Sequence, residues 1–305
     1  MQKSEQFAKK LERTQYDALV YLESVKDNKK STQRTIAEYT HRSIGLINST
    51  IQELQKLDYV NDGKITALGI KALEPYKVKR AIFLAAGIGE RLIPITLNTP
   101  KPLVRVRGTR LIDTTLDAVV AAGIDDIIII RGYLSEQFDQ LLYKYPGLKF
   151  VENPIYMESN NISSLMCVRH CLQNTYIFDA DIFLNNRSLV TKYQYSSNYL
   201  GIPVDVTDDW VIESKNGFIT GARIGGKNCH KVAGISYWTE DDGLRMAEHI
   251  GQVFDKPGGK EFFWDQALFD FYTGLFKVEI RECSSEDVVE IDTFNQLKQL
   301  DKAYK

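Results

Sequence analysis

Long hydrophobic runs are missing from this sequence, and their absence excludes the proteins that depend on them. The N-terminus, MQKSEQFAKKLERTQ, lacks the apolar core of a signal peptide. No stretch approaches the roughly 18 uninterrupted apolar residues of a transmembrane helix. The apolar run Ile127–Ile130 suits a buried strand. We therefore expect a cytoplasmic protein without a membrane partner.

Cysteine is scarce and the charge is nearly balanced, which argues against a cysteine metal site and against a protein that coats nucleic acid. The four cysteines include no Cys-x-x-Cys pair, so buried thiols in a reducing compartment are expected rather than a metal site. A net charge of −2 argues against a protein that is basic throughout and coats nucleic acid. Residues 1–78 nevertheless carry 13 Lys and Arg against 10 Asp and Glu, so this front part is mildly basic.

The first 78 residues read as a small helical domain. Apolar spacing and turn residues predict helices over residues 5–27, 32–39, 43–57 and 66–76, with a hairpin at Asp62–Gly63 before the last. Ser31 or Thr32 is the expected cap of the second helix. The residues expected to face inward are Phe7, Leu11, Tyr16, Leu19, Val20 and Leu22 on the first helix, and Ile44, Ile47, Ile51 and Leu54 on the third.

This order of elements resembles the winged helix-turn-helix domains of bacterial regulators, including the Ile65-Thr66-x-x-Gly69 that leaves the wing. The resemblance implies that helix 43–57 would lie in a major groove of DNA. The side chains it would offer there are Thr40, Arg42, Ser43, Asn48 and Gln52. Winged helices also serve as dimerisation or docking modules, so DNA binding and a homodimer both stay open. We take residues 1–78 as this domain and residues 79–305 as a second one.

From Ala81 onward, strand-like apolar runs alternate with helical stretches. The segments are 80–85, 111–122, 126–131, 135–143, 149–152, 163–171 and 175–179. Such alternation predicts an α/β fold with a mostly parallel sheet that helices cover on both faces.

A loop rich in small residues follows the first of these strands. In residues 85–89, alanines and glycines let backbone N–H groups approach a polyphosphate closely. Arg91 adds a guanidinium group, and Lys101 adds an ammonium between two prolines. A dinucleotide fingerprint would need glycine where Leu92 stands, and a P-loop would need Gly-Lys-Ser/Thr, so neither class is indicated.

The whole string from Leu84 to Leu103, Leu-Ala-Ala-Gly-x-Gly-x-Arg-Leu-x-Pro-x-Thr-x-x-x-Pro-Lys-Pro-Leu, resembles the signature of the sugar-nucleotidyltransferase superfamily. Within it the likeness is greatest to bacterial choline-phosphate cytidylyltransferases. Further segments that share it are 152–156, 160–165, 179–181, 234–238, 264–265 and 290–292. The resemblance covers residues 79–305 and implies a Rossmann-like nucleotidyltransferase fold with a mixed, mostly parallel sheet.

The resemblance also implies an activity, a cofactor and site residues. The implied reaction transfers CMP from CTP to phosphocholine, giving CDP-choline and pyrophosphate. Mg²⁺ would be held by Asp181 and Asp292, and catalysis would fall to Lys101, Arg91 and Asp181. The residues implied to bind the nucleotide are Leu84, Ala85, Ala86, Gly87, Gly89, Glu90, Arg91, Gly132, Tyr133, Asn161 and Ser164. The residues alone do not distinguish cytosine from uracil.

Aromatic residues in the second half suggest where the acceptor binds. Aromatic faces recognise a quaternary ammonium well. We expect Trp210, Tyr237 and Trp264 to form such a cage, with Asp265, Asp209 or Glu290 adding negative charge. Phosphoethanolamine and 2-aminoethylphosphonate stay alternatives, because both are cationic and carry a phosphoryl-type oxygen nucleophile.

Two other functions remain as alternatives. A sugar 1-phosphate nucleotidyltransferase would keep the fold, but aromatic residues stand where partners for sugar hydroxyls would be expected. A ligand-sensing transcriptional regulator would explain the front domain. The joint presence of Arg91, Lys101, Asp181 and Asp292 argues against a sensor that has lost catalysis.

Overall fold

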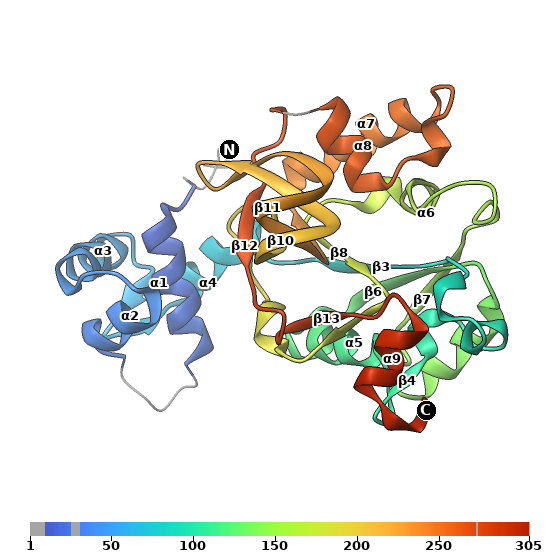
Figure 1. The fold of residues 1–305 in the computed structure, drawn as a ribbon. Helices are drawn as coiled ribbons and strands as arrows, with labels where there is room; N and C mark the ends of the chain where they lie inside the picture. Colours follow the sequence, from blue (N-terminus) through green and yellow to red (C-terminus); the bar gives the residue numbers. More distant parts are fainter. Residues whose placement is uncertain (1–9, 26–30, 273, 305) are drawn as a thin grey trace, which may run out of the picture. The chain divides into compact units, whose positions relative to one another are not determined.

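The computed structural model describes residues 10–25, 31–272 and 274–304. The chain divides into two compact units between Lys77 and Val78, one residue before the predicted boundary (Figure 1). Within the described residues, no helix combines the length and the apolar character needed to cross a membrane.

The N-terminal unit consists of short helices and one small hairpin. Its elements are α1 (Arg13–Ser24), α2 (Gln33–Thr40), α3 (Ile44–Lys56), β1 (Val60–Asn61), β2 (Lys64–Ile65) and α4 (Ala67–Leu73). Thr32, Ser43 and Thr66 each accept a hydrogen bond from a backbone N–H in the first turn of α2, α3 and α4. The hairpin turns at Asp62 and Gly63, whose φ angles are 46° and 72°, as the Asp-Gly pair predicts.

The helix predictions for this unit need two corrections. In the described residues, the first helix begins at Arg13, so Leu11 is buried ahead of the helix rather than on it; Phe7 lies outside the described residues. Ile44 was expected inward but is 53% exposed, because it starts α3 away from the buried stripe. Ile47, Ile51 and Leu54 form that stripe as predicted.

The C-terminal unit is built on a seven-stranded sheet in the order β10-β12-β11-β8-β3-β6-β7. Its strands are β3 (Arg80–Ala85), β6 (Asp126–Arg131), β7 (Lys149–Glu152), β8 (Thr175–Asp179), β10 (Asn198–Lys215), β11 (Phe218–Trp238) and β12 (Glu279–Glu282). Strands β7, β6, β3 and β8 are parallel, whereas β11 runs antiparallel to β8. The mixed, mostly parallel α/β sheet that the sequence predicts is therefore confirmed.

Helices pack against both faces of this sheet (Figure 1). They are α5 (Leu111–Ala121), α6 (Ile162–Cys167), α7 (Glu240–Phe254) and α8 (Trp264–Phe271). Helix α9 (Phe294–Leu300) packs instead into a separate small core with Leu92 and Val104. Alternate residues of β3 serve the two faces: Phe83 joins the core formed with α5, and Ile82 joins the core formed with α6, α7 and α8. Residues 135–143 form a 3₁₀ helix, and the helix predicted over 163–171 is α6 followed by a 3₁₀ turn.

Two short strand pairs and their loops complete the unit. The strands are β4 (Arg105–Val106) with β5 (Thr109–Arg110), and β9 (Ile182–Leu184) with β13 (Val288–Glu290). The pairing of β13 with β9 brings the end of the chain back beside the residues that follow β8. It thereby positions two carboxylates of the site described next.

Candidate active site

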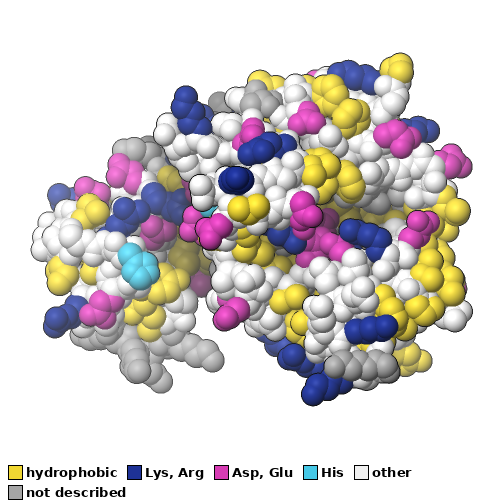
Figure 2. All heavy atoms as spheres, in the orientation of Figure 1, with side chains coloured by type: hydrophobic (Ala, Val, Ile, Leu, Met, Phe, Trp, Pro, Cys, Tyr) yellow, Lys and Arg dark blue, Asp and Glu magenta, His cyan; other side chains and the backbone are white. Residues whose placement is uncertain are grey.

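A cavity of about 830 Å³ opens at the carboxyl ends of β3 and β8, the edge at which open α/β sheets bind ligands. Its walls come from the loop after β3, the segment 153–164, the turn after β8, and parts of β10, β11 and β13. Figure 2 shows acidic side chains gathered between basic ones in a hollow on this unit. The cavity is therefore highly charged.

The loop after β3 lies close to the segment that carries Lys101. Gly89 has a φ of +71°, and a Cβ at this position would lie only 2.9 Å from the Cβ of Lys101. Only glycine fits both the backbone angle and this close approach. The hydroxyl of Thr96 donates a hydrogen bond of 2.9 Å to the carbonyl of Gly89. The loop and the lysine are therefore held as one wall of the cavity.

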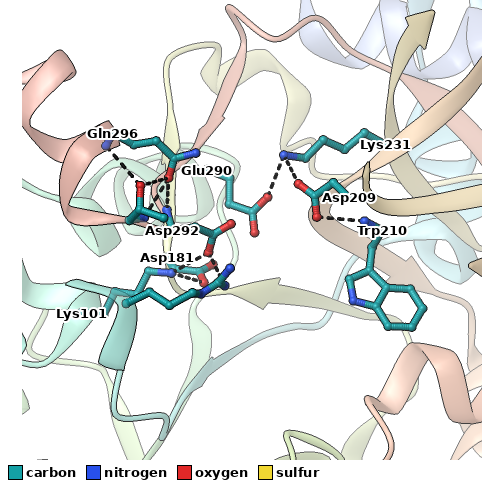
Figure 3. A network of polar contacts seen from close by, with 10 residues as sticks. Lys101, Asp181, Asp209, Trp210, Lys231, Glu290, Asp292 and Gln296 are labelled. Carbon is teal, nitrogen blue, oxygen red and sulfur yellow. Dashed lines mark hydrogen bonds and ion pairs between the residues drawn. The ribbon is translucent and has the colours of Figure 1, made fainter. Parts of the chain in front are cut away.

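Lys101 is the central cation of the cavity. Its Nζ lies 2.9 Å from Asp181 Oδ2 and 3.0 Å from Asp292 Oδ1 (Figure 3). Burial opposes its charge, but the two carboxylates outweigh that effect and raise the pKa of Lys101. Arg91 Nη2 lies 2.8 Å from the same Oδ1 of Asp292. Burial alone would raise the pKa of Asp292, yet Lys101 and Arg91 lower it.

Asp181, Glu290 and Asp292 form a carboxylate cluster beside Lys101. One oxygen of each lies within 4.8 Å of the others. Among the described residues, Asp181 Oδ1 is buried without a hydrogen-bond partner, which is costly unless a ligand completes the site. The backbone N–H of Asp292 donates 2.8 Å to Gln296 Oε1, in the cap of α9. The donor set fits a hard divalent cation.

Glu290 belongs to this cluster and not to the acceptor end where the sequence placed it. Its pKa is raised to about 8, first by burial and then by Asp181 and Asp292. Its Oε2 lies 3.2 Å from the ammonium of Lys231. Strand pairing explains the position, because Glu290 faces Ile182 in the pairing of β13 with β9.

The part of the cavity away from Lys101 combines two aromatic rings with the carboxylate of Asp265, and Asp179 interacts with both Asp265 and Asp181. The rings of Trp210 and Phe263 meet edge to face, with centroids 5.6 Å apart. Asp179 and Asp265 line the same cavity. Burial raises the pKa of each, with Asp181 and Asp265 adding to the shift at Asp179. The Tyr199 hydroxyl donates a hydrogen bond of 3.2 Å to Asp265.

Comparison with known proteins agrees with this geometry. A family model described as nucleotidyl transferase matches residues 80–175. A 2-aminoethylphosphonate cytidylyltransferase of Lancefieldella rimae is 33% identical over 228 residues, covering 73% of this chain and 92% of that protein. A choline-phosphate cytidylyltransferase of Streptococcus pneumoniae is 34% identical over 230 residues, covering 74% and 98%. The chain belongs to the nucleotidyltransferase family.

A solved structure extends the likeness to three dimensions. The CTP:phosphocholine cytidylyltransferase of Streptococcus pneumoniae superimposes on this nucleotidyltransferase with a TM-score of 0.69 at 32% identity, over 75% of this chain and 100% of that one. The fold and the family are thus supported by sequence and structure together.

Most predicted site residues line the cavity of this nucleotidyltransferase. They are Leu84, Ala85, Ala86, Gly87, Gly89, Glu90, Arg91, Lys101, Asn161, Ser164, Asp181, Trp210, Asp265, Glu290 and Asp292. Asn161 also accepts a hydrogen bond of 2.9 Å from the backbone N–H of Trp264, at the start of α8. Segments predicted separately are therefore brought together around one cavity.

The aromatic cage predicted from the sequence needs correction at Tyr237 and Trp264. Tyr237 is completely buried, and its hydroxyl donates 3.0 Å to Asn174 in the core. Trp264 is 1% exposed and stacks on Tyr199, beneath the cavity wall. Because α8 begins at Trp264, its neighbour Phe263 faces the cavity instead. We drop Tyr237 and Trp264 from the acceptor site.

Gly132 and Tyr133 were expected to contact the base, but they support the loop instead of lining the cavity. A Cβ at Gly132 would lie 2.7 Å from the ring of Tyr156, so glycine lets that ring pack closely. Tyr133 donates its backbone N–H to Ala86 at 3.1 Å and its hydroxyl to Thr96 at 2.8 Å. Both residues therefore act on the shape of the loop.

Lys231 is a further charged residue of the site that no sequence motif marks. Its Nζ lies 2.6 Å from Asp209 Oδ2 as well as 3.2 Å from Glu290. A single lysine in a polar strand gives no indication in the sequence that it lies between two carboxylates. Its position becomes clear only from the path of β11, which passes both Asp209 and Glu290.

Proposed function

We propose that this nucleotidyltransferase moves CMP from CTP to a small phosphate or phosphonate that carries an ammonium group. One observation carries the proposal: a single cavity joins Lys101 and the carboxylate cluster at one end to Trp210, Phe263 and Asp265 at the other. Such a cavity suits a triphosphate beside a small cationic acceptor. The cytidylyltransferases to which the chain is similar support CTP as the nucleotide.

The reaction requires positioning and charge neutralisation more than covalent catalysis. An oxygen of the acceptor's phosphate or phosphonate attacks the α-phosphorus of CTP. The new P–O bond forms as the bond from that phosphorus to the β-phosphate oxygen breaks, and pyrophosphate leaves. Lys101 is placed to neutralise charge on the transferred phosphoryl group. The loop amides of residues 85–89 and Arg91 would hold the leaving pyrophosphate.

We assign Mg²⁺ to the carboxylates of Asp181, Glu290 and Asp292. The unpartnered Oδ1 of Asp181 and the closeness of the three groups support this assignment. When bound, the ion would supply positive charge to the nucleotide phosphates. Lys101 remains hydrogen-bonded to two of these carboxylates and keeps them oriented toward the cavity.

The acceptor end favours a primary ammonium over a quaternary one. A primary ammonium donates three hydrogen bonds, and Asp179 and Asp265 offer carboxylate oxygens in the cavity. A quaternary ammonium instead needs several aromatic faces, and of the three predicted cage residues only Trp210 lines the cavity. We therefore place phosphoethanolamine and 2-aminoethylphosphonate ahead of phosphocholine.

Pyrophosphate release by the purified protein with Mg²⁺ tests the proposal. CTP, UTP and GTP would each be combined with phosphocholine, phosphoethanolamine, 2-aminoethylphosphonate and glucose 1-phosphate. We expect turnover with CTP and the ammonium-bearing acceptors. Turnover confined to glucose 1-phosphate would contradict the ammonium-bearing acceptor and indicate a sugar 1-phosphate instead. Tight nucleotide binding without any turnover would favour the ligand-sensing regulator.

The N-terminal unit supports a second proposal, that it is a winged helix-turn-helix domain that contacts DNA. Helix α3 is capped by Ser43 and exposes Asn48 and Gln52, and Arg42 is exposed beside its start. Thr40, also predicted to contact DNA, instead donates its hydroxyl to the carbonyl of Ile36. A gel-shift assay with the full chain and its own promoter region tests this proposal. Absence of binding at low salt would leave dimerisation or docking as the role of the unit.

A further inference from the structure

A continuous series of polar contacts runs from the carboxylate cluster to the aromatic wall of the cavity (Figure 3). Glu290 Oε2 lies 3.2 Å from Lys231 Nζ, and that ammonium lies 2.6 Å from Asp209 Oδ2. The other oxygen of Asp209 accepts a hydrogen bond of 2.8 Å from the backbone N–H of Trp210. Lys231 is thus the one cation between the two ends of the cavity in this series of contacts.

The path of β10 explains why these residues meet. Lys231 on β11 is paired with Ile202 and also with Val211, so β10 passes on both sides of it. Between these pairings the register shifts from Thr207 to Trp210. The residues of this bulge depend on side chains for their hydrogen bonds: the N–H of Asp209 donates 3.1 Å to Thr207 Oγ1. An irregular segment of this kind needs support from outside the ladder.

Electrostatics also explains why Lys231 lies between Asp209 and Glu290. Asp209 and Glu290 both line the cavity, together with Asp179, Asp181 and Asp265. Like charges this close repel one another. The ammonium of Lys231, whose side chain is 25% exposed, lies between two of them. Without it, Asp209 would lose the counter-charge that holds it, and the backbone N–H of Trp210 would lose the fixed position of its acceptor, Asp209 Oδ1.

We propose that Lys231 is a positioning residue of the acceptor site: by tying Asp209 to Glu290, it fixes Trp210 in the cavity wall. Lys231 acts through Asp209 and does not itself touch the acceptor. This inference rests on the proposed function, because it assigns Trp210 to the acceptor end. Beyond that function, Lys231 sets the position of the Trp210 ring relative to the carboxylate cluster.

Steady-state kinetics of Lys231→Met test the proposal. We expect the KM for the acceptor to rise about ten- to a hundredfold, the range by which remote misplacement impairs an active site. The KM for CTP should rise less than the KM for the acceptor, because Lys101, Arg91 and the loop of residues 85–89 are left intact. Lys227→Met is the matched control, since Lys227 is exposed on the same strand. Equal rises in both KM values with a lower melting temperature would overturn the proposal in favour of a general structural role.

A double-mutant cycle separates positioning from direct contact. If Lys231 acts through Asp209, then Asp209→Asn should reproduce the effect of Lys231→Met, and the double variant should be little worse than either single one. If Lys231 contacts the acceptor phosphate or phosphonate itself, the two effects will multiply. Multiplicative effects would overturn the proposal.

Tryptophan fluorescence gives a readout that needs no turnover. Trp238 and Trp264 are buried, at 0% and 1% exposure, so acrylamide quenching of the full chain reports mainly on Trp210. We expect Lys231→Met, but not Lys227→Met, to increase quenching. Unchanged quenching would overturn the proposal. If the wild-type protein shows no cytidylyl transfer but the quenching difference appears, the positioning role stands and the proposed function fails.

Discussion

The ammonium of Lys101 lies 2.9 Å from Asp181 Oδ2, although 80 positions separate the two residues in the sequence. Asp292 approaches the same ammonium at 3.0 Å from a third part of the chain. The two carboxylates raise the pKa of Lys101 despite its burial, so the cation is retained at neutral pH. A charged group held this firmly is suited to stabilise charge that develops on a phosphoryl group without reorganising.

Replacement of Lys101 by Gln should therefore lower kcat by about 10²- to 10³-fold, as loss of a charge-stabilising donor does in other enzymes. The KM for CTP should change little, because Arg91 and the loop amides remain. Pyrophosphate release at saturating CTP measures the effect. Lys215→Gln, at an exposed position, controls for general effects of removing a lysine. A kcat within about threefold of the wild type would show that Lys101 has no role in the transfer.

Mg²⁺ should stabilise the folded protein in the absence of substrates. An ion that binds only the folded state raises the free energy of unfolding by mass action. We expect millimolar Mg²⁺ to raise the melting temperature of the wild type, and Asp181→Asn to abolish the rise, because Asp181 offers the unpartnered buried oxygen. Differential scanning fluorimetry measures both.

Asp241→Asn, at an exposed position in α7, is the control for this effect and should keep the full response to Mg²⁺. If Asp181→Asn responds to Mg²⁺ like the wild type, the carboxylate cluster is not the site of the ion.

The parallel part of the sheet could be predicted from sequence because its signals are local. Strands β3, β6, β7 and β8 have the bounds that their apolar runs predict. The string that identified the family was likewise recognisable, because its small residues, Arg91 and Lys101 lie close together in the sequence. In each case neighbouring residues alone determine the feature.

The parts that were not predicted depend on contacts between distant segments. Glu290 joins Asp181 only because β13 pairs with β9, and no periodic pattern announces a pairing of such short strands. Trp264 and Phe263 are adjacent aromatic residues, and the start of α8 alone decides that Phe263 faces the cavity. Residue type cannot distinguish a core aromatic side chain from one in a binding site.

Trp264 and Trp210 should respond to alanine substitution in opposite ways. Trp264→Ala removes a fully buried ring and should cost about 3–5 kcal/mol in the free energy of unfolding. Trp210→Ala should leave stability nearly unchanged and raise the KM for the acceptor several-fold, through loss of a cation–π contact of about 0.5–2 kcal/mol. Urea unfolding and steady-state kinetics on both variants measure the two effects. A marked loss of stability in Trp210→Ala with an unchanged KM for the acceptor would show that the Trp210 ring is a core residue and not part of the acceptor site.

Asp126 should make the stability of the C-terminal unit depend on acid pH. Its carboxylate lies 2.6 Å from Arg80 and 2.9 Å from Lys149, at the starts of three parallel strands. Burial opposes ionisation, but the two cations lower the pKa of Asp126 below its ordinary value of 3.8. The folded state therefore binds the proton less readily than the unfolded chain. The contribution of Asp126 to the free energy of unfolding is complete above that pKa value and is lost as the pH falls below it.

Asp126→Asn should cost about 1–2 kcal/mol at pH 7 and progressively less toward pH 3, measured by urea unfolding at each pH. The neighbouring, exposed Asp125 offers the control Asp125→Asn; an equal loss there, or a loss at Asp126 that is independent of pH, would refute the ion-pair explanation.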